Sequence, residues 1–412
     1  MKISSLYSFE VLDSRGKPTV RTVVELEDGS KHSSSVPSGA STGTHEAVEL
    51  RDGDNDRYLG FGVSKAVENV NSQIQEVVRG LSVLDPKKVD SVMLELDGTN
   101  NKSKLGANAV LSVSQAVIRA AAHAENVPVW KFINQYYFSS RNPSFPRLMV
   151  NVVNGGKHAG WNFDIQEFMI VPTSQKPSES TRVAAEIFTQ LGKKLKKLSL
   201  STLVGDEGGY SPLLKSNEEV FDTITESASD LGYTNGIEYQ FAIDAAASEF
   251  FENGTYVMKK TNEQLNGDRL LSYYRDLQQK YNIISFEDPF AEDDWDHFKE
   301  LTPENNEYLV VGDDLYVTNP ERIQKGIKQS STNAVLIKLN QIGSVSETMS
   351  AIALTQNAGW KTIISHRSGE TEDSFIADVA YGVGADFIKT GSMSRSERLA
   401  KYNRLIEIEN GI

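Results

Sequence analysis

Six charged side chains in the C-terminal half of the chain each stand at the end of a short apolar run. They are Asp244, Glu287, Asp313, Lys338, His366 and Lys389. Short apolar runs bounded by polar residues are typical of buried strands. Three acids followed in the chain by Lys, His and Lys predict a divalent metal that faces a basic catalytic group.

The three acids have the chemistry of metal ligands. Carboxylate oxygens suit Mg²⁺, which binds a few carboxylates together with water and substrate oxygens. The alternative is that these acids cap the helices that follow them, and Asp288 and Asp314 offer a second acid at two of the positions. Three acids at corresponding strand ends favour the metal interpretation.

Lys338 is a candidate general base. A lysine at the end of a buried strand is costly unless it has a purpose. Burial and a neighbouring cation lower the pKa of a lysine, and Lys389 is the candidate for that cation. The alternative is that both lysines extend along the barrel rim and keep their ammonium groups in water.

Two further acids are candidates for general acid catalysis. Glu207 lies in the segment GDEGG, whose glycines allow the backbone to approach a ligand closely, although the same segment could be an ordinary turn. Glu167 directly precedes the apolar run FMIVP. Carboxylates on the rim opposite Lys338 would supply a proton to a leaving group.

Small and glycine-rich loops provide candidate ligand contacts. Residues 37–43 (PSGASTG), which include Ser41, could form a mobile lid, a phosphate-binding loop or a plain linker. Arg367 and Ser368 follow a strand end and suit phosphate, which arginine binds through two parallel hydrogen bonds. His158 follows another glycine-rich segment, but a lone histidine is more often structural.

The elements that must position these residues form a repeating pattern. Five of the six strand-end residues are followed by a stretch long enough for a helix, and most lie roughly 25 residues apart. Strand, polar tip and helix in repetition predict a closed α/β barrel, in which the C-terminal strand ends carry the chemistry. Apolar runs at 148–153, 168–172 and 202–206 extend the strand series toward the N-terminus.

The first third of the chain has a different pattern. Two strand-like runs are joined by Asp28-Gly29, a strong hairpin signal. Residues 62–80 and 104–126 then have the periodicity of amphipathic helices. We therefore expect an N-terminal α+β domain over residues 1–135 and a catalytic barrel domain over residues 136–412.

Composition limits the class of protein. The chain has 412 residues, 39% of them hydrophobic and 24% charged, and this length predicts more than one domain. No apolar run approaches the ~20 residues needed to span a membrane, and the N-terminus has no apolar signal segment. A net charge of −14 disfavours nucleic acid as the main partner. The absence of cysteine fits a reducing compartment, so we expect a cytoplasmic protein.

Long segments of the chain resemble the enolase family. Those that carry the resemblance include LDSRGKPTV, VPSGASTGTHEAVELRDGD, VNVVNGGKHAG, VGDEGGYSP, SFEDPFAEDDW, LIKLNQIGSVSET and SHRSGETEDSF. The resemblance covers nearly the whole chain. It implies an N-terminal α+β cap domain and a barrel of the order ββαα(βα)₆, whose first turn is antiparallel. It also implies the Mg²⁺-dependent dehydration of 2-phosphoglycerate to phosphoenolpyruvate in glycolysis.

The resemblance also implies a role for each candidate residue. Asp244, Glu287 and Asp313 resemble the ligands of a first Mg²⁺, and Ser41 resembles a ligand of a second. Lys338 resembles the base that removes the C2 proton, and Glu207 resembles the acid that protonates the leaving hydroxyl, with Glu167 beside it. Lys389 and His366 would contact the substrate carboxylate, Arg367 and Ser368 the phosphate, and His158 would belong to a second closing loop. Enolases use a Lys or His base with one or two Mg²⁺ ions.

Members of this family assemble as homodimers, so the resemblance implies a homodimer for this chain. A higher oligomer is the alternative. The resemblance places Arg21 and Glu407 at positions that pair across the subunit interface, with both charges inverted relative to many relatives. Lys157 and Trp161 depart from the family pattern next to His158. Two other functions stay open: an acid-sugar lyase or racemase on the same fold, and a non-catalytic binding protein.

Overall fold

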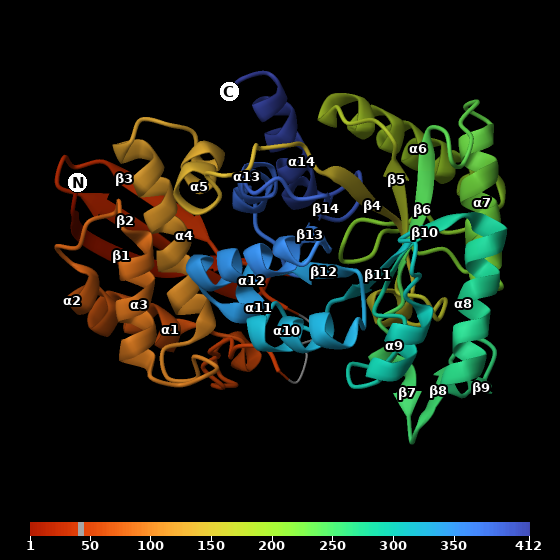
Figure 1. Cartoon of the computed structure of the whole chain (residues 1–412), viewed down its shortest axis with the longest axis horizontal. Coiled ribbons are helices and arrows are strands. Elements are labelled where there is room, and N and C mark those ends of the chain that lie inside the picture. The colour runs from red at the N-terminus through yellow and green to blue at the C-terminus, as the bar shows by residue number, and fades with distance from the viewer. Residues whose placement is uncertain (40–44) are drawn as a thin grey trace.

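The computed structural model describes residues 1–39 and 45–412, which form an N-terminal domain beside a barrel (Figure 1). The N-terminal domain has a three-stranded antiparallel sheet in the order β1-β2-β3. Its strands are β1 (Ile3–Leu12), β2 (Pro18–Leu26) and β3 (Lys31–Ser35). The turn between β2 and β3 contains Gly29 at a φ of +83°, a conformation that glycine adopts readily. The predicted hairpin is therefore confirmed.

Helical segments follow this sheet in the chain and pack against it or against one another. They are η1 (Tyr58–Gly60), α1 (Ser64–Asn69), η2 (Val70–Ile74), α2 (Gln75–Val78), α3 (Pro86–Asp97), α4 (Ala107–Ala124) and α5 (Val129–Tyr137). Helix α4 contacts β2 and β3 as well as α3 and α5, and most of its residues are buried. Its many alanines and serines let these neighbours approach closely, because small side chains leave little distance between backbones.

The barrel is closed by eight strands in the order β10-β11-β12-β13-β14-β4-β5-β6. They are β4 (Arg147–Asn154), β5 (Glu167–Pro172), β6 (Tyr239–Asp244), β10 (Ile283–Glu287), β11 (Leu309–Gly312), β12 (Ala334–Ile337), β13 (Lys361–Ser365) and β14 (Phe387–Lys389). Strand β5 is antiparallel to both β4 and β6, whereas the remaining pairs are parallel. This confirms the expected barrel and its irregular start.

Helices surround the barrel and connect its strands (Figure 1). They are η3 (Gly156–Ala159), α6 (Pro177–Lys197), α7 (Asn217–Ser229), η4 (Ala247–Phe250), α8 (Gly267–Tyr281), α9 (Trp295–Leu301), α10 (Pro320–Gln329), α11 (Leu339–Ile342), α12 (Val345–Asn357), α13 (Phe375–Gly382) and α14 (Ser396–Glu409). A small sheet of β7 (Phe251–Glu252), β8 (Thr255–Met258) and β9 (Glu263–Leu265) follows η4. In the described residues, no helix combines the length and apolar character required to cross a membrane.

Apolar side chains fill the barrel interior below the charged rim. This inner cluster contains Met149, Met169, Val171, Ala242, Leu309, Val311, Ala334, Leu336, Ile363 and Phe387. Because side chains alternate along a strand, the neighbouring residues face outward and pack against the surrounding helices. The interior is therefore a packed core that supports the rim.

The strand expected at 202–206 is not formed. Val204 makes only an isolated bridge to Tyr210, and Leu203 and Val204 are exposed. Both lie in the loop between α6 and α7, where two glycines, Gly208 and Gly209, turn the chain back toward the barrel. An apolar run of this length lacks the periodicity that would separate strand from loop.

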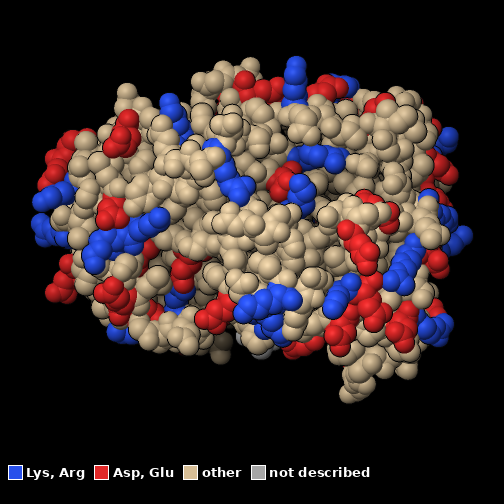
Figure 2. Space-filling model, viewed as in Figure 1, with Lys and Arg blue, Asp and Glu red and all other residues tan. Residues whose placement is uncertain are grey.

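Helices of the two domains pack against each other. Helix α3 contacts α12, α4 contacts α11 and α12, and α5 contacts α13. The buried carboxylate of Asp90 on α3 accepts a hydrogen bond from the backbone N–H of Ser346 at 2.9 Å, in the first turn of α12. Acidic and basic side chains are interspersed over the face shown in Figure 2.

Candidate active site

The six charged residues that end the predicted strands lie on one rim of the barrel. Asp244, Glu287 and Lys389 are the last residues of β6, β10 and β14, and Asp313, Lys338 and His366 directly follow β11, β12 and β13. Parallel strands bring their C-terminal ends to the same edge, so residues far apart in the sequence meet here. Five of these six, all but Glu287, line one cavity together with Glu167, Glu207, Arg367 and Ser368.

Glu167 reaches this rim because β5 runs opposite to its neighbours. It is the first residue of β5 and pairs with Asp244, the last residue of β6. The start of an antiparallel strand and the ends of parallel strands thus share one edge. Sequence reasoning placed Glu167 near a strand but could not supply this direction.

Glu207 enters the site from the loop between α6 and α7. Its Oε2 accepts a hydrogen bond from Nδ2 of Asn151 on β4 at 3.0 Å, and its Oε1 lies 3.6 Å from Nε2 of His366. A Cβ on Gly208 would lie 2.7 Å from the carbonyl oxygen of Ser394, and a Cβ on Gly209 would lie 2.8 Å from Oδ1 of Asn154. The flanking glycines therefore allow the loop to press against the barrel and hold Glu207 in the cavity.

Lys389 lies at the centre of a group of buried acids. Its Nζ is 3.0 Å from Asp244, 2.8 Å from Glu287 and 3.1 Å from Glu167. Burial alone would lower the pKa of Lys389, but the surrounding carboxylates raise it well above its usual value. Lys389 is therefore a fixed positive charge at this rim.

The rim carries more acids than the lysines can neutralise. Burial and then neighbouring carboxylates raise the pKa of Glu167, Glu287 and Asp288 well above their usual values. Oε2 of Glu167 is buried without a hydrogen-bond partner. A cluster of carboxylates that is costly to ionise and has an unused oxygen fits a hard divalent cation such as Mg²⁺.

Two groupings of acids could hold such a cation. The predicted group is Asp244, Glu287 and Asp313, at the ends of the adjacent strands β6, β10 and β11. Among the described residues, Asp288, Asp313 and Asp314 have potential ligand atoms within 4.8 Å of one another. The carboxylate of Asp288 also accepts hydrogen bonds from the backbone N–H groups of Asp313 at 2.9 Å and Asp314 at 2.8 Å. These hydrogen bonds to Asp288 hold the chain in place directly after β11. Asp313 is the acid that belongs to both groupings.

Lys338 does not have the lowered pKa expected from the sequence. Burial and Arg367 lower its pKa, but the carboxylate of Asp313, which its Nζ contacts, raises it more, and the net shift is upward. Lys389 is not among the main causes. A role as base therefore requires another cation to take over the carboxylate of Asp313.

Arg367 is held by a residue of the N-terminal domain. Its guanidinium pairs with the carboxylate of Glu46 through Nη1 at 2.9 Å and Nη2 at 3.2 Å, and Nη1 also donates to Oδ1 of Asn340 at 3.0 Å. Both side chains of the pair are buried. Sequence reasoning missed Glu46, because nothing in its local pattern indicates a partner more than three hundred residues away.

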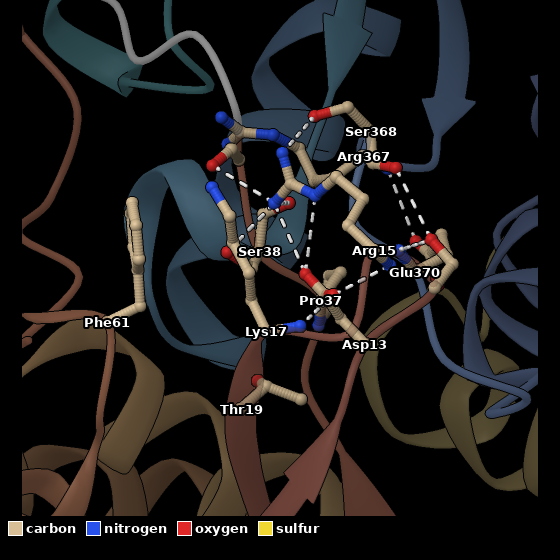
Figure 3. Close-up of polar contacts among 12 residues, drawn as sticks. Asp13, Arg15, Lys17, Thr19, Pro37, Ser38, Phe61, Arg367, Ser368 and Glu370 are labelled. Carbon is tan, nitrogen blue, oxygen red and sulfur yellow. Dashed lines mark hydrogen bonds and ion pairs between the residues drawn. The ribbon is translucent and has the colours of Figure 1, made fainter. Parts of the chain in front are cut away.

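The loop between β1 and β2 also reaches the site. Figure 3 shows Arg15 pointing toward Asp13, Ser38 and Ser368. Its Nη1 donates to Oγ of Ser368 at 3.3 Å, and its Nη2 donates to Oγ of Ser38 at 3.3 Å and to Oδ2 of Asp13 at 3.2 Å. Arg15 thus connects the segment that leads to residue 40 with the phosphate-binding candidate Ser368.

Two predicted residues cannot be placed in this geometry. Ser41 lies within 40–44, outside the described residues, and for His158 only the backbone is described, in η3. Beside it, Nζ of Lys157 pairs with Glu249 at 2.9 Å, and Nζ of Lys259 lies 5.4 Å from the centre of the Trp161 ring. Both residues that depart from the family pattern therefore connect this loop to the segment after β6.

Comparison with known protein families agrees with this architecture. The family described as "Enolase, N-terminal domain" matches residues 3–133, and the family described as "Enolase, C-terminal TIM barrel domain" matches residues 142–412. Together the two matches cover almost the entire chain.

Proposed function

Because this chain belongs to the enolase family, we propose that it catalyses the reversible, Mg²⁺-dependent dehydration of 2-phospho-D-glycerate to phosphoenolpyruvate. Family membership establishes an enzyme of the lyase type with an enolase-superfamily reaction. The observation that carries the finer assignment is one cavity lined by Lys338, Glu207, Arg367 and Ser368. It combines a candidate base, a candidate acid and a phosphate-binding pair.

The reaction begins at C2 of the substrate. The C2 proton is a poor acid because it lies beside a carboxylate, and its removal produces a dianionic carboxylate. Lys338, which directly follows β12, takes this proton. Mg²⁺ ions, held by Asp244, Glu287, Asp313 and, for the second ion, Ser41, would supply positive charge that stabilises the dianion.

Loss of the C3 hydroxyl follows and requires a proton. Glu207, held by Asn151, donates it, and Glu167 lies beside the same rim. Lys389 and His366 bind the substrate carboxylate. Arg367, oriented by Glu46, binds the phosphate with Ser368, and His158 belongs to the loop that closes over the substrate.

The proposal extends to the assembly and setting of the enzyme. We assign it to glycolysis and gluconeogenesis in the cytoplasm, acting as a homodimer or a higher oligomer. The domain division at residues 135 and 136 also belongs to this proposal, with the first domain carrying the lid that contains Ser41.

The test is direct conversion of substrate. Purified protein is mixed with 2-phosphoglycerate and Mg²⁺, and the enol product is followed by its ultraviolet absorbance. We expect phosphoenolpyruvate to form, chelation to abolish turnover and Mg²⁺ to restore it. Full activity after exhaustive chelation would remove the metal-dependent mechanism, and turnover of an acid sugar in place of 2-phosphoglycerate would reassign the substrate.

A further inference from the structure

Arg398 on α14 is a fully buried arginine that contacts two segments of the active site. Its Nη1 donates to the carbonyl oxygen of Arg367 at 2.6 Å, and its Nη2 donates to the carbonyl oxygens of Ser368 at 2.7 Å and Asp206 at 3.1 Å. Asp206 immediately precedes Glu207. Arg398 therefore joins the loop after β13 to the loop that carries the candidate acid.

A further contact of Arg398 determines which nitrogen of His366 carries the proton. Nη1 of Arg398 lies 2.6 Å from Nδ1 of His366. A guanidinium can only donate hydrogen bonds, so Nδ1 must accept and the ring proton must lie on Nε2. That Nε2 is buried without a hydrogen-bond partner and faces Oε1 of Glu207 at 3.6 Å.

The surroundings also keep the ring neutral. Burial lowers the pKa of His366, and the positive charges of Arg398, Lys389 and Lys338 lower it further, whereas Glu207 acts in the opposite direction. The net effect places the pKa well below its usual value. A neutral imidazole with its proton on Nε2 can donate one hydrogen bond into the cavity.

We propose that Arg398 is a positioning residue that holds His366 as the neutral Nε2–H tautomer, so that His366 donates a hydrogen bond to a substrate oxygen beside Glu207. His366 thus acts neither as a base nor as a cation. The statement about the substrate oxygen rests on the proposed function, whereas the tautomer itself does not.

The first test uses the unmodified protein. The chain has 6 histidines, so ¹⁵N-detected spectra of the imidazole rings can be assigned by the signals that disappear in His366→Gln. We expect His366 to show a protonated Nε2 and an unprotonated Nδ1 at neutral pH, because Arg398 donates to Nδ1. A protonated Nδ1, or an imidazolium at neutral pH, would overturn the proposal.

The second test separates positioning from structural support. Arg398→Lys keeps the charge, but one ammonium cannot replace the guanidinium fork that serves His366 and three carbonyl groups. We expect mixed tautomers of His366 and at least a tenfold lower kcat with a smaller change in KM. The matched control is Arg404→Lys on the same helix, where the arginine pairs with Asp378 and does not contact His366.

The control should keep the Nε2–H tautomer and the kcat of the unmodified enzyme. Loss of kcat in Arg398→Lys with an unchanged tautomer would contradict the positioning role. If the unmodified protein has the expected tautomer but no turnover of 2-phosphoglycerate, the proposed function fails while the assignment of the tautomer stands.

Discussion

Adjacent acids at the rim have separate tasks. Asp313 faces Lys338 and accepts a hydrogen bond from Nε2 of Gln341 at 2.8 Å, whereas the carboxylate of Asp288 is directed at backbone N–H groups. Asp314 stands next to Asp313, and burial raises its pKa to about 7. Asp313 belongs to both groupings of acids that could hold a cation, whereas Asp314 belongs to one, which favours Asp313 as the metal ligand.

We predict that metal affinity distinguishes these acids. Asp313→Asn should weaken Mg²⁺ binding by more than about 100-fold, because it removes a ligand, and Asp288→Asn by about 10- to 100-fold, because it releases the backbone that positions one. Asp314→Asn should change the affinity by less than about tenfold. Titration calorimetry measures the Mg²⁺ affinity of all three variants. A larger loss of affinity in Asp314→Asn than in Asp313→Asn would show that Asp314, and not Asp313, is the ligand.

At the scale of elements, one carboxylate connects a helix of each domain. Asp90 on α3 accepts a hydrogen bond from the backbone N–H of Ser346 at the start of α12. Burial raises the pKa of Asp90 to about 6. The raised value means that ionisation of Asp90 is less favourable in the folded protein than in the unfolded chain. Its contribution to stability is therefore complete below about pH 4 and is lost as the pH rises through about 6.

We predict that Asp90→Asn removes this pH dependence. Relative to the variant, the unfolding free energy of the unmodified protein should fall by up to about 3 kcal/mol between about pH 4 and pH 7. Denaturant unfolding or proteolysis at a series of pH values measures the difference. The control is Glu95→Gln on the exposed side of α3, which leaves Asp90 in place and should therefore keep the fall in unfolding free energy that Asp90 causes. A parallel pH dependence in Asp90→Asn would show that Asp90 is not the responsible group.

The strands of the barrel could be predicted from the sequence, whereas several contacts of the site could not. Apolar runs that end in a charged residue predicted β6 and β10 to β14, because a buried parallel strand needs apolar residues along its length and its tip faces the rim. The run at 202–206 also ends in a charged residue and is not a strand. The rim position of Glu167 depends on the direction of β5, and the contacts of Glu46 and Arg398 depend on chain segments that meet only in three dimensions. The residues around Glu46 or Arg398 in the sequence do not indicate which distant segments they will contact.

At the scale of the whole molecule, the N-terminal domain contributes to the site as well as covering it. Glu46 orients Arg367, and Arg15 joins Ser38 to Ser368 (Figure 3). Both contacts cross from one domain to the other, so the phosphate-binding candidates depend on how the domains sit together. The isolated barrel should therefore bind an anionic substrate less well than the full chain.

The surface of the N-terminal domain also bears on assembly. Large apolar side chains are exposed on β1 and in and directly after η1, at Tyr7, Phe9, Leu12, Tyr58, Leu59 and Phe61. Within the chain, Arg21 pairs with Glu372 at 2.8 Å and Glu407 pairs with Arg404 at 3.0 Å. Arg21 and Glu407 therefore each have a partner in their own subunit besides the one proposed across a dimer interface.

We predict that a charge-swap cycle detects the pair between subunits. Arg21→Glu and Glu407→Arg should each weaken the homodimer, and the double variant should recover much of the loss, because opposite charges again face each other. Sedimentation velocity over a range of concentrations measures the dimer dissociation. Glu372→Gln, which removes only the partner of Arg21 in its own chain, should leave the dimer unchanged. A monomeric unmodified protein, or no recovery in the double variant, would contradict the interface.

The most direct test of the account is exchange of the C2 proton of 2-phosphoglycerate with deuterated solvent, followed by NMR in the presence of Mg²⁺. Lys338 and Glu207 stand on different elements and act in different steps, so their losses should be separable. Lys338→Ala should abolish both exchange and formation of phosphoenolpyruvate. Glu207→Gln should retain exchange while product formation falls by about 10²- to 10⁴-fold, because deprotonation precedes departure of the hydroxide. Equal loss of exchange in both variants, or exchange that survives in Lys338→Ala, would contradict the assignment of base and acid.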